Sequence, residues 1–141
     1  MVSVLIDEIK VGDKGSVSKT ISESDVYNFA GVTGDFSWLH VDEVKAQKGP
    51  FGRRIVHGML TIGLISAVVG TQMPGVGTIY ASQNIKFVRP VFIGDTITAE
   101  VEIIEIMREK GLVRINATAT NQHGELVLAG EGTVVPPKER Y

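Results

Sequence analysis

Residues 57–72 read HGMLTIGLISAVVGTQ, and this stretch decides the fold of the chain. Nearly every position is apolar, so the segment has no polar face and predicts a helix that other elements must cover. Its longest apolar run, from Met59 to Val69, is too short to cross a membrane and is typical of a buried core helix. The Met73-Pro74-Gly75 sequence predicts the end of that helix.

The sequence after this helix changes to a pattern typical of strands. Apolar and polar side chains alternate in residues 96–107 until the Ile103-Ile104 pair, which predicts a bulge or strong coiling at that point. The remaining strand candidates share β-branched content and flanking turn residues, and they lie at 79–88, 112–120 and 126–134, with a hairpin turn at 121–124.

The sequence before the core helix predicts a strand, a helix and an irregular overhang. Residues 14–20 predict a short edge strand. Ser22 and Asp25 resemble a capping box that opens a helix ending near residues 31–34. Residues 35–52 then form an overhang with one helical turn at 42–47. We therefore expect a single α+β domain over residues 1–141, in which a curved antiparallel sheet wraps around one long central helix.

Composition excludes several classes of function. The chain has 141 residues with 43% hydrophobic and 21% charged residues, as in ordinary globular proteins. A net charge of −2 without a basic run argues against nucleic acid as a partner. No cysteine is present, which excludes disulfides and thiol nucleophiles. Because the N-terminus does not resemble a signal peptide and no run is long enough to span a bilayer, we expect a cytoplasmic protein without membrane contact.

The segment from Thr33 to His40 brings a carboxylate and an imidazole close in sequence. Asp35 and His40 are five positions apart, which places them on different faces of a helix and on opposite faces of a strand. They can share one water molecule only if the segment curls, which Gly34 favours. The alternative is that Asp35 caps a turn and His40 is a half-buried loop residue.

Other candidate site residues have structural alternatives. Trp38, the only tryptophan, either lines a pocket or fixes the overhang to the core. The three histidines have no metal-ligand spacing, so we expect no metal site.

Three segments in order carry a resemblance to a known family. Residues 29–40, FAGVTGDFSWLH, resemble the hydratase motif of the MaoC-like dehydratases, most of all the (R)-specific enoyl-CoA hydratases. Residues 55–60 and 89–96 resemble the start of that family's central helix and its strand-turn-strand motif. The resemblance implies a hotdog fold, a homodimer, an acyl-CoA thioester substrate, a hydro-lyase reaction and no cofactor.

The resemblance also implies roles for individual residues. Asp35 and His40 correspond to the catalytic pair, Gly58 to the backbone N–H that binds the thioester oxygen, and Ser66 to a polar residue near the pair. Hydration of an enoyl thioester needs a water, a proton and a donor to the oxygen, and these groups supply all three. Where the family usually has Asn-Pro, this chain has Ser37-Trp38, so Trp38 is a candidate for shortening the acyl pocket.

Two alternatives to the hydratase remain at this point. The first is a hotdog acyl-CoA thioesterase, in which the activated water attacks the thioester carbonyl. The second is an acyl-CoA-binding module without catalysis. Candidate cations for the phosphates of the substrate are Arg53, Arg54, Lys86 and Arg89.

Overall fold

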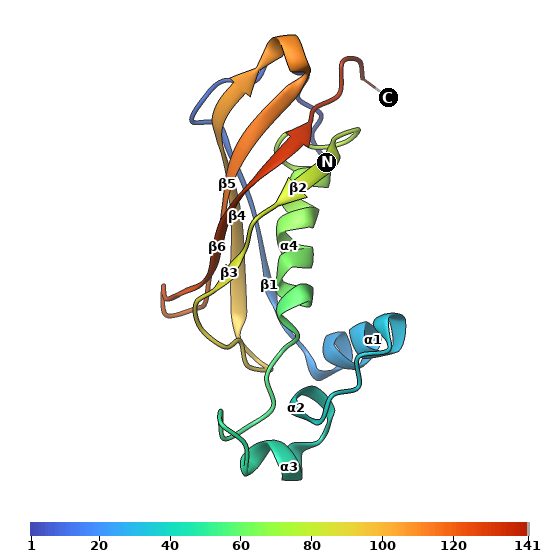
Figure 1. Cartoon of the computed structure of the whole chain (residues 1–141), viewed down its shortest axis with the longest axis vertical. Helices are drawn as coiled ribbons and strands as arrows, with labels where there is room; N and C mark the ends of the chain where they lie inside the picture. The colour runs from blue at the N-terminus through green and yellow to red at the C-terminus, as the bar shows by residue number, and fades with distance from the viewer. Residues whose placement is uncertain (141) are drawn as a thin grey trace.

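Helix α4 (Gly58–Thr71) lies along one face of a curved antiparallel sheet, which confirms the predicted hotdog arrangement (Figure 1). The computed structural model describes residues 1–140. His57 is the residue before the helix and Gln72 the residue after it, so both predicted ends are correct within one residue. No helix within the described part of the chain has both the length and the apolar character needed to cross a bilayer.

The sheet has six strands in the order β1-β4-β5-β6-β2, and β3 also pairs with β6. The predicted bulge is present, because the β4–β5 register shifts between Ile103 and Glu105. The strands share antiparallel pairing and are β1 (Lys14–Thr20), β2 (Ile79–Gln83), β3 (Lys86–Phe87), β4 (Thr96–Met107), β5 (Leu112–Thr120) and β6 (Leu126–Val135).

The segment predicted as one strand at 79–88 is divided into β2 and β3. Here the backbone crosses close over β6, and the Asn84 carbonyl occupies the space that a side chain at Gly130 would need. The Asn84 N–H still donates to the Glu131 carbonyl at 2.7 Å. The contact with Gly130 therefore bends the chain between the two short strands, a feature that strand periodicity does not contain.

The core lies between the sheet and α4. Side chains of β4 and β5 alternate between buried and partly exposed along each strand, as predicted. Small residues, Ala99, Ala117 and Ala119, are fully buried on the face that also carries Ile115. Small side chains let a helix approach a sheet closely, so this face accommodates α4.

The expectation that α4 is covered on all sides is met only on the sheet side. Met59, Gly63 and Ser66 are exposed. Their spacing of three and four residues places them on one face of the helix. This face, with the partly exposed Ile62, is called the open face of α4 below.

Three short helices occupy one end of the molecule, beyond the sheet (Figure 1). They are α1 (Glu23–Thr33), α2 (Trp38–Val41) and α3 (Glu43–Gln47), while a single 3₁₀ turn, η1 (Arg108–Lys110), joins β4 to β5. We call residues 22–57 the helical end. The capping box is confirmed, because Ser22 Oγ accepts from the Asp25 N–H at 3.0 Å and Asp25 Oδ2 accepts from the Ser22 N–H at 2.9 Å.

The helical end agrees with the prediction except for one additional helix. Helix α1 continues through Gly31 and ends at Gly34, whose φ of +81° is the left-handed conformation that glycine favours. The predicted turn at 42–47 is α3, capped by Asp42. Helix α2 was not predicted, since four residues give no helical period.

Candidate active site

The structure brings Asp35 and His40 together. Gly34 turns the chain out of α1, residues 35–37 form a short connector, and α2 carries His40 back. Asp35 Oδ2 lies 3.9 Å from His40 Nε2. Asp35 Oδ1 also accepts from the Ser37 N–H at 3.1 Å, so the carboxylate caps a turn and faces the imidazole at once. The turn cap and the approach to the imidazole, the two arrangements considered from the sequence, are therefore both present in one side chain.

A backbone carbonyl fixes the orientation of His40. His40 Nδ1 lies 2.7 Å from the Ile55 carbonyl oxygen. Because a carbonyl only accepts, Nδ1 carries the proton, and in the neutral ring Nε2 is left as an acceptor facing Asp35. The His40 side chain is 10% exposed and that of Asp35 is 52% exposed. The pair is thus an exposed carboxylate beside a buried, oriented imidazole.

His57 contacts both residues of this pair. Its ring stacks on that of His40 with centroids 3.8 Å apart and planes 25° apart, and the Phe29 ring lies 4.8 Å away on a tilted plane. His57 Nε2 donates to the Asp35 carbonyl at 2.9 Å. Within residues 1–140 its Nδ1 has no hydrogen-bond partner. Because His57 directly precedes α4, its hydrogen bond to Asp35 joins residues 35–37 to the start of the core helix.

Asp35, His40 and His57 form a trio that the sequence spacing did not reveal. One candidate ligand atom from each residue lies within 4.8 Å of the others. The lone pairs of imidazole lie in the ring plane, so those of two stacked rings lie in two separate and nearly parallel planes. Ligands of a tetrahedral metal site must instead converge on one point. The geometry therefore favours acid–base chemistry over metal binding.

Gly58, the first residue of α4, borders an open cavity beside the start of the helix. The first N–H groups of a helix have no hydrogen-bond partner within the helix, and the Gly58 N–H is one of them. The helix dipole favours negative charge at this end. The cavity has a volume of about 430 Å³ and its lining is mainly apolar, with Ile55, Val56, Gly58, Thr61, Phe87, Arg89, Val91 and Leu128 among its lining residues. An apolar cavity beside an anion-stabilising N–H suits an acyl thioester.

Phe87 and Thr61 are cavity residues that sequence reasoning missed. A Cβ on Gly58 would lie 2.5 Å from the Phe87 ring, so only glycine allows this packing. The Thr61 hydroxyl is buried and has no hydrogen-bond partner within the described residues. Phe87 belongs to a two-residue strand and Thr61 to an apolar helix, so neither carries a local sequence signal of function.

Two of the predicted substrate-binding residues lie away from this cavity. The Trp38 ring packs against Gly49, where a Cβ would lie 2.9 Å from it, and Trp38 is not among the residues that line the cavity. Gly49 belongs to the overhang itself, so this contact joins two parts of the overhang to each other. Ser66 lies on the open face of α4, two turns beyond Gly58. The single chain does not place Ser66 beside Asp35 and His40.

The four candidate cations differ in their availability. Arg54 is engaged by Glu23, Tyr27 and Glu43. The Arg53 guanidinium lies 3.7 Å from the centre of the Phe92 ring. Arg89 lines the cavity and lies 3.5 Å from Glu125. Lys86 is exposed on β3 and is not among the residues that line the cavity. Of the four, Arg89 is therefore the cation best placed at the cavity.

The fold and the site define a hotdog protein with an aspartate–histidine pair beside the start of its central helix. Residues 8–125 match the model of the MaoC like domain, and the chain belongs to this family.

Known relatives agree with this assignment. The chain is 49% identical over 131 residues to an (R)-specific enoyl-CoA hydratase of Rhodospirillum rubrum, covering 93% of this chain and 90% of the relative. It is 44% identical to a 3-hydroxybutyryl-CoA dehydratase of Methylorubrum extorquens, covering 94% and 84%. The structure of R-hydratase PhaJ1 from Pseudomonas aeruginosa, in the unliganded form, superposes with a TM-score of 0.92 at 39% identity, covering 97% and 88%.

Proposed function

We propose that this protein is an (R)-specific enoyl-CoA hydratase. It reversibly adds water to trans-2-enoyl-CoA and forms (R)-3-hydroxyacyl-CoA without a cofactor. The observation that carries the proposal is the 3.9 Å approach of Asp35 Oδ2 to His40 Nε2, next to the first turn of α4. The names of the relatives, two of which act on CoA thioesters, support the same reaction.

The proposed reaction uses one water molecule held between Asp35 and His40. Its oxygen forms a bond to C3 of the enoyl group, and one residue of the pair takes the proton that it loses. The pair then delivers a proton to C2, which returns both residues to their starting protonation, so the C2=C3 double bond becomes single and both additions occur on one face. The Gly58 N–H donates to the thioester oxygen, where negative charge develops in the transition state. The helix dipole adds to that stabilisation.

Contacts that link the pair, the donor and the cavity support this chemistry. His40 donates to the carbonyl of Ile55, and Ile55 lines the cavity. His57 contacts both Asp35 and His40, and Gly58 is the next residue. An enoyl group seated between Gly58 and the pair would extend its acyl chain into the apolar cavity.

We propose that the chain acts as one hotdog domain in a cytoplasmic homodimer. Met59 on the open face of α4 and Ile79 on β2 are exposed, and β2 is an edge of the sheet. Apolar side chains and an unpaired strand edge are surfaces that a second copy can cover. A mass of about twice 15.2 kDa by light scattering supports the dimer, and a monomer contradicts it. Fractionation of the native host tests the compartment.

The test of the reaction is hydration of crotonyl-CoA, followed by loss of the enoyl absorbance and chiral analysis of the product. We expect (R)-3-hydroxybutyryl-CoA without release of free thiol. Thiol release with no loss of the double bond would instead identify a thioesterase. Binding of crotonyl-CoA without turnover would identify a binding module, and the (S) product would contradict the proposed stereochemistry.

A further inference from the structure

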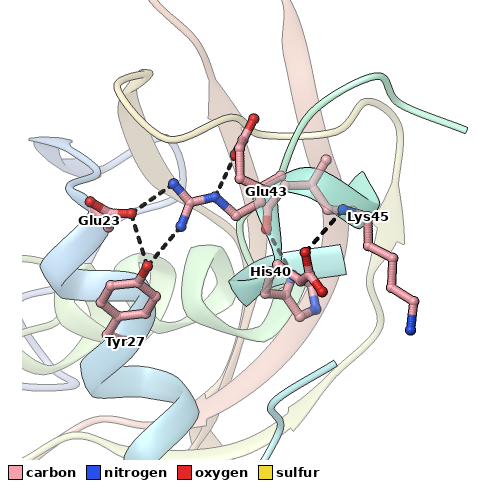
Figure 2. A network of polar contacts seen from close by, with 8 residues as sticks. Glu23, Tyr27, His40, Glu43 and Lys45 are labelled. Carbon is pink, nitrogen blue, oxygen red and sulfur yellow. Dashed lines mark hydrogen bonds and ion pairs between the residues drawn. The ribbon is translucent and has the colours of Figure 1, made fainter. Parts of the chain in front are cut away.

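We infer that Arg54 is a positioning residue for His40, an inference that rests on the proposed function. The Arg54 guanidinium connects separate helices of the helical end. Its Nε donates to Glu43 of α3 at 2.6 Å, and one terminal nitrogen lies 2.7 Å from Glu23 of α1. The other terminal nitrogen donates to the Tyr27 hydroxyl at 3.0 Å. Figure 2 shows Glu23, Tyr27 and Glu43 around this guanidinium.

The acceptors are themselves linked, which makes the cluster a closed network. Tyr27 donates its hydroxyl proton to Glu23 at 2.9 Å. The Arg54 side chain is only 15% exposed, and its hydrogen bond to Glu43, followed by those to Glu23 and Tyr27, raises its pKa further above its ordinary value. The same guanidinium lowers the pKa of Glu23. Arg54 and Glu23 are therefore held in their charged forms, and Arg54 is not free to bind a substrate phosphate.

The residue after Arg54 makes two contacts with the helix that carries His40. The Ile55 carbonyl accepts from His40 Nδ1 at 2.7 Å, and the Ile55 N–H donates to the Leu39 carbonyl at 3.0 Å. On the other side, the Val56 N–H donates to the Val91 carbonyl at 2.7 Å. The backbone at 55–56 is thus the link between α2 and the core, and Arg54 fixes its outer end.

The direction of the Ile55 carbonyl decides which nitrogen of His40 carries the proton. With this carbonyl in place, Nδ1 is protonated and Nε2 faces Asp35 as the acceptor. Without the Arg54 contacts, α1, α3 and the 54–56 segment are joined here by fewer restraints. The carbonyl then moves, and both tautomers and orientations of His40 become populated. A misplacement of about 1 Å at a catalytic group can cost about 100-fold in rate.

Arginine suits this position better than lysine. A guanidinium offers donors in three directions within one plane, and Arg54 uses all three of its nitrogens. A lysine ammonium is a single point of charge on a flexible stem, so it cannot hold the same acceptors in the same geometry. The positioning role therefore predicts that lysine does not substitute for Arg54.

The experiment compares Arg54→Met and Arg54→Lys with Arg114→Met. Arg114 is a matched control because it pairs with two glutamates, Glu105 and Glu131, on the surface of the sheet. We expect Arg54→Met to lower kcat for crotonyl-CoA by about 10- to 100-fold, with KM within about twofold. Arg54→Lys should recover less than half of that loss. Arg114→Met should leave kcat and KM unchanged, whatever it does to the unfolding midpoint.

A second measurement separates this inference from the proposed function. ¹⁵N NMR of the imidazoles should show His40 protonated at Nδ1 in the parent chain and as a mixture of tautomers in Arg54→Met. If the parent has no hydratase activity, the proposed function fails, while the tautomer result still decides the role of Arg54. An unchanged tautomer with unchanged kcat in folded Arg54→Met overturns the inference, as does an equal loss of kcat in Arg114→Met.

A milder variant covers the case in which Arg54→Met does not fold. Tyr27→Phe removes one acceptor of Arg54 and keeps both glutamate pairs. We expect a fewfold loss of kcat and a partial change of the His40 tautomer. A folded Tyr27→Phe with parental kcat and the parental tautomer would contradict the inference.

Discussion

The sheet with α4 and the helical end are held together by different forces. Among residues 1–140, the largest fully buried side chains come mostly from the strands and α4, and the helical end contributes only Val26. The helical end relies instead on caps, ion pairs and histidine contacts, and it leaves Phe36 and Val44 exposed. We therefore expect the apolar region to supply most of the stability and the polar region to supply the proposed reactive groups.

This difference predicts that substitutions in the two regions separate into two kinds. Changes in the sheet and α4 should lower the free energy of unfolding without altering the chemistry of the molecules that remain folded. Changes in the helical end should alter turnover with small effects on unfolding. The predictions below test that separation, beginning with the largest effect.

Asp35→Ala and His40→Ala should each lower kcat by roughly 1,000-fold or more, because each removes one half of a cooperating acid–base pair. The double variant should be little worse than the worse single variant. Crotonyl-CoA hydration measures kcat, and circular dichroism confirms the fold. Asp13→Ala is the matched control, since Asp13 also caps a turn, accepting from the Lys10 N–H at 2.8 Å, but lies outside the site. Parental activity in either site variant would contradict the assignment.

Ile115→Ala should lower the free energy of unfolding by about 3 kcal/mol, because Ile115 is fully buried in the centre of the sheet. Urea unfolding measures this value. The kcat per folded molecule should stay within about twofold, since transition-state contacts are unchanged. A large loss of kcat in fully folded protein would show that the two regions are not separate.

Phe87→Ala should change the preference for acyl length, because Phe87 fills the space beside Gly58 at the cavity. We expect the ratio of rates on eight-carbon and four-carbon enoyl-CoA to rise by about tenfold. Trp38→Ala, which removes a ring packed on Gly49, should leave that ratio within about twofold. The reverse outcome would restore Trp38 as the residue that limits the pocket.

Acid should destabilise the helical end through Glu23, with the smallest effect of the four. Arg54 and Tyr27 lower the pKa of Glu23 below its ordinary value of 4.5. A lowered pKa in the folded state means that the stabilisation is present above pH 4.5 and is lost as the pH falls through the folded value. Unfolding midpoints of the parent and Glu23→Gln should therefore converge on acidification. Parallel curves would show that this ion pair contributes nothing to stability.

The regular part of the fold could be predicted from the sequence because periodicity is a local property. Alternation placed β4 at its observed bounds and placed the bulge at Ile103-Ile104, while strand-forming residues between turns placed β5. The capping box at Ser22 gave the start of α1 for the same reason. The break between β2 and β3 could not be predicted, since it depends on the contact of Asn84 with Gly130 across the sheet.

The candidate site was predictable only in part. The sequence paired Asp35 with His40 and named Gly58, because two short motifs, at 29–40 and at 55–60, carry these residues. It did not reveal that His57 stacks on His40, nor that Arg54 gathers Glu23, Tyr27 and Glu43. These contacts join residues up to 31 positions apart (23 to 54), and their arrangement exists only after the chain folds.

The position of His57 determines how much sequence a protein engineer must transfer to move this site to another scaffold. His57 holds the Asp35 carbonyl while it directly precedes the central helix. A transplant of the short motif at 33–40 alone would leave the carboxylate without a fixed reference to the recipient's helix. The smallest transferable unit therefore runs from the cap at Ser22 to Gly58 and has to be fused in register with the recipient's own core helix.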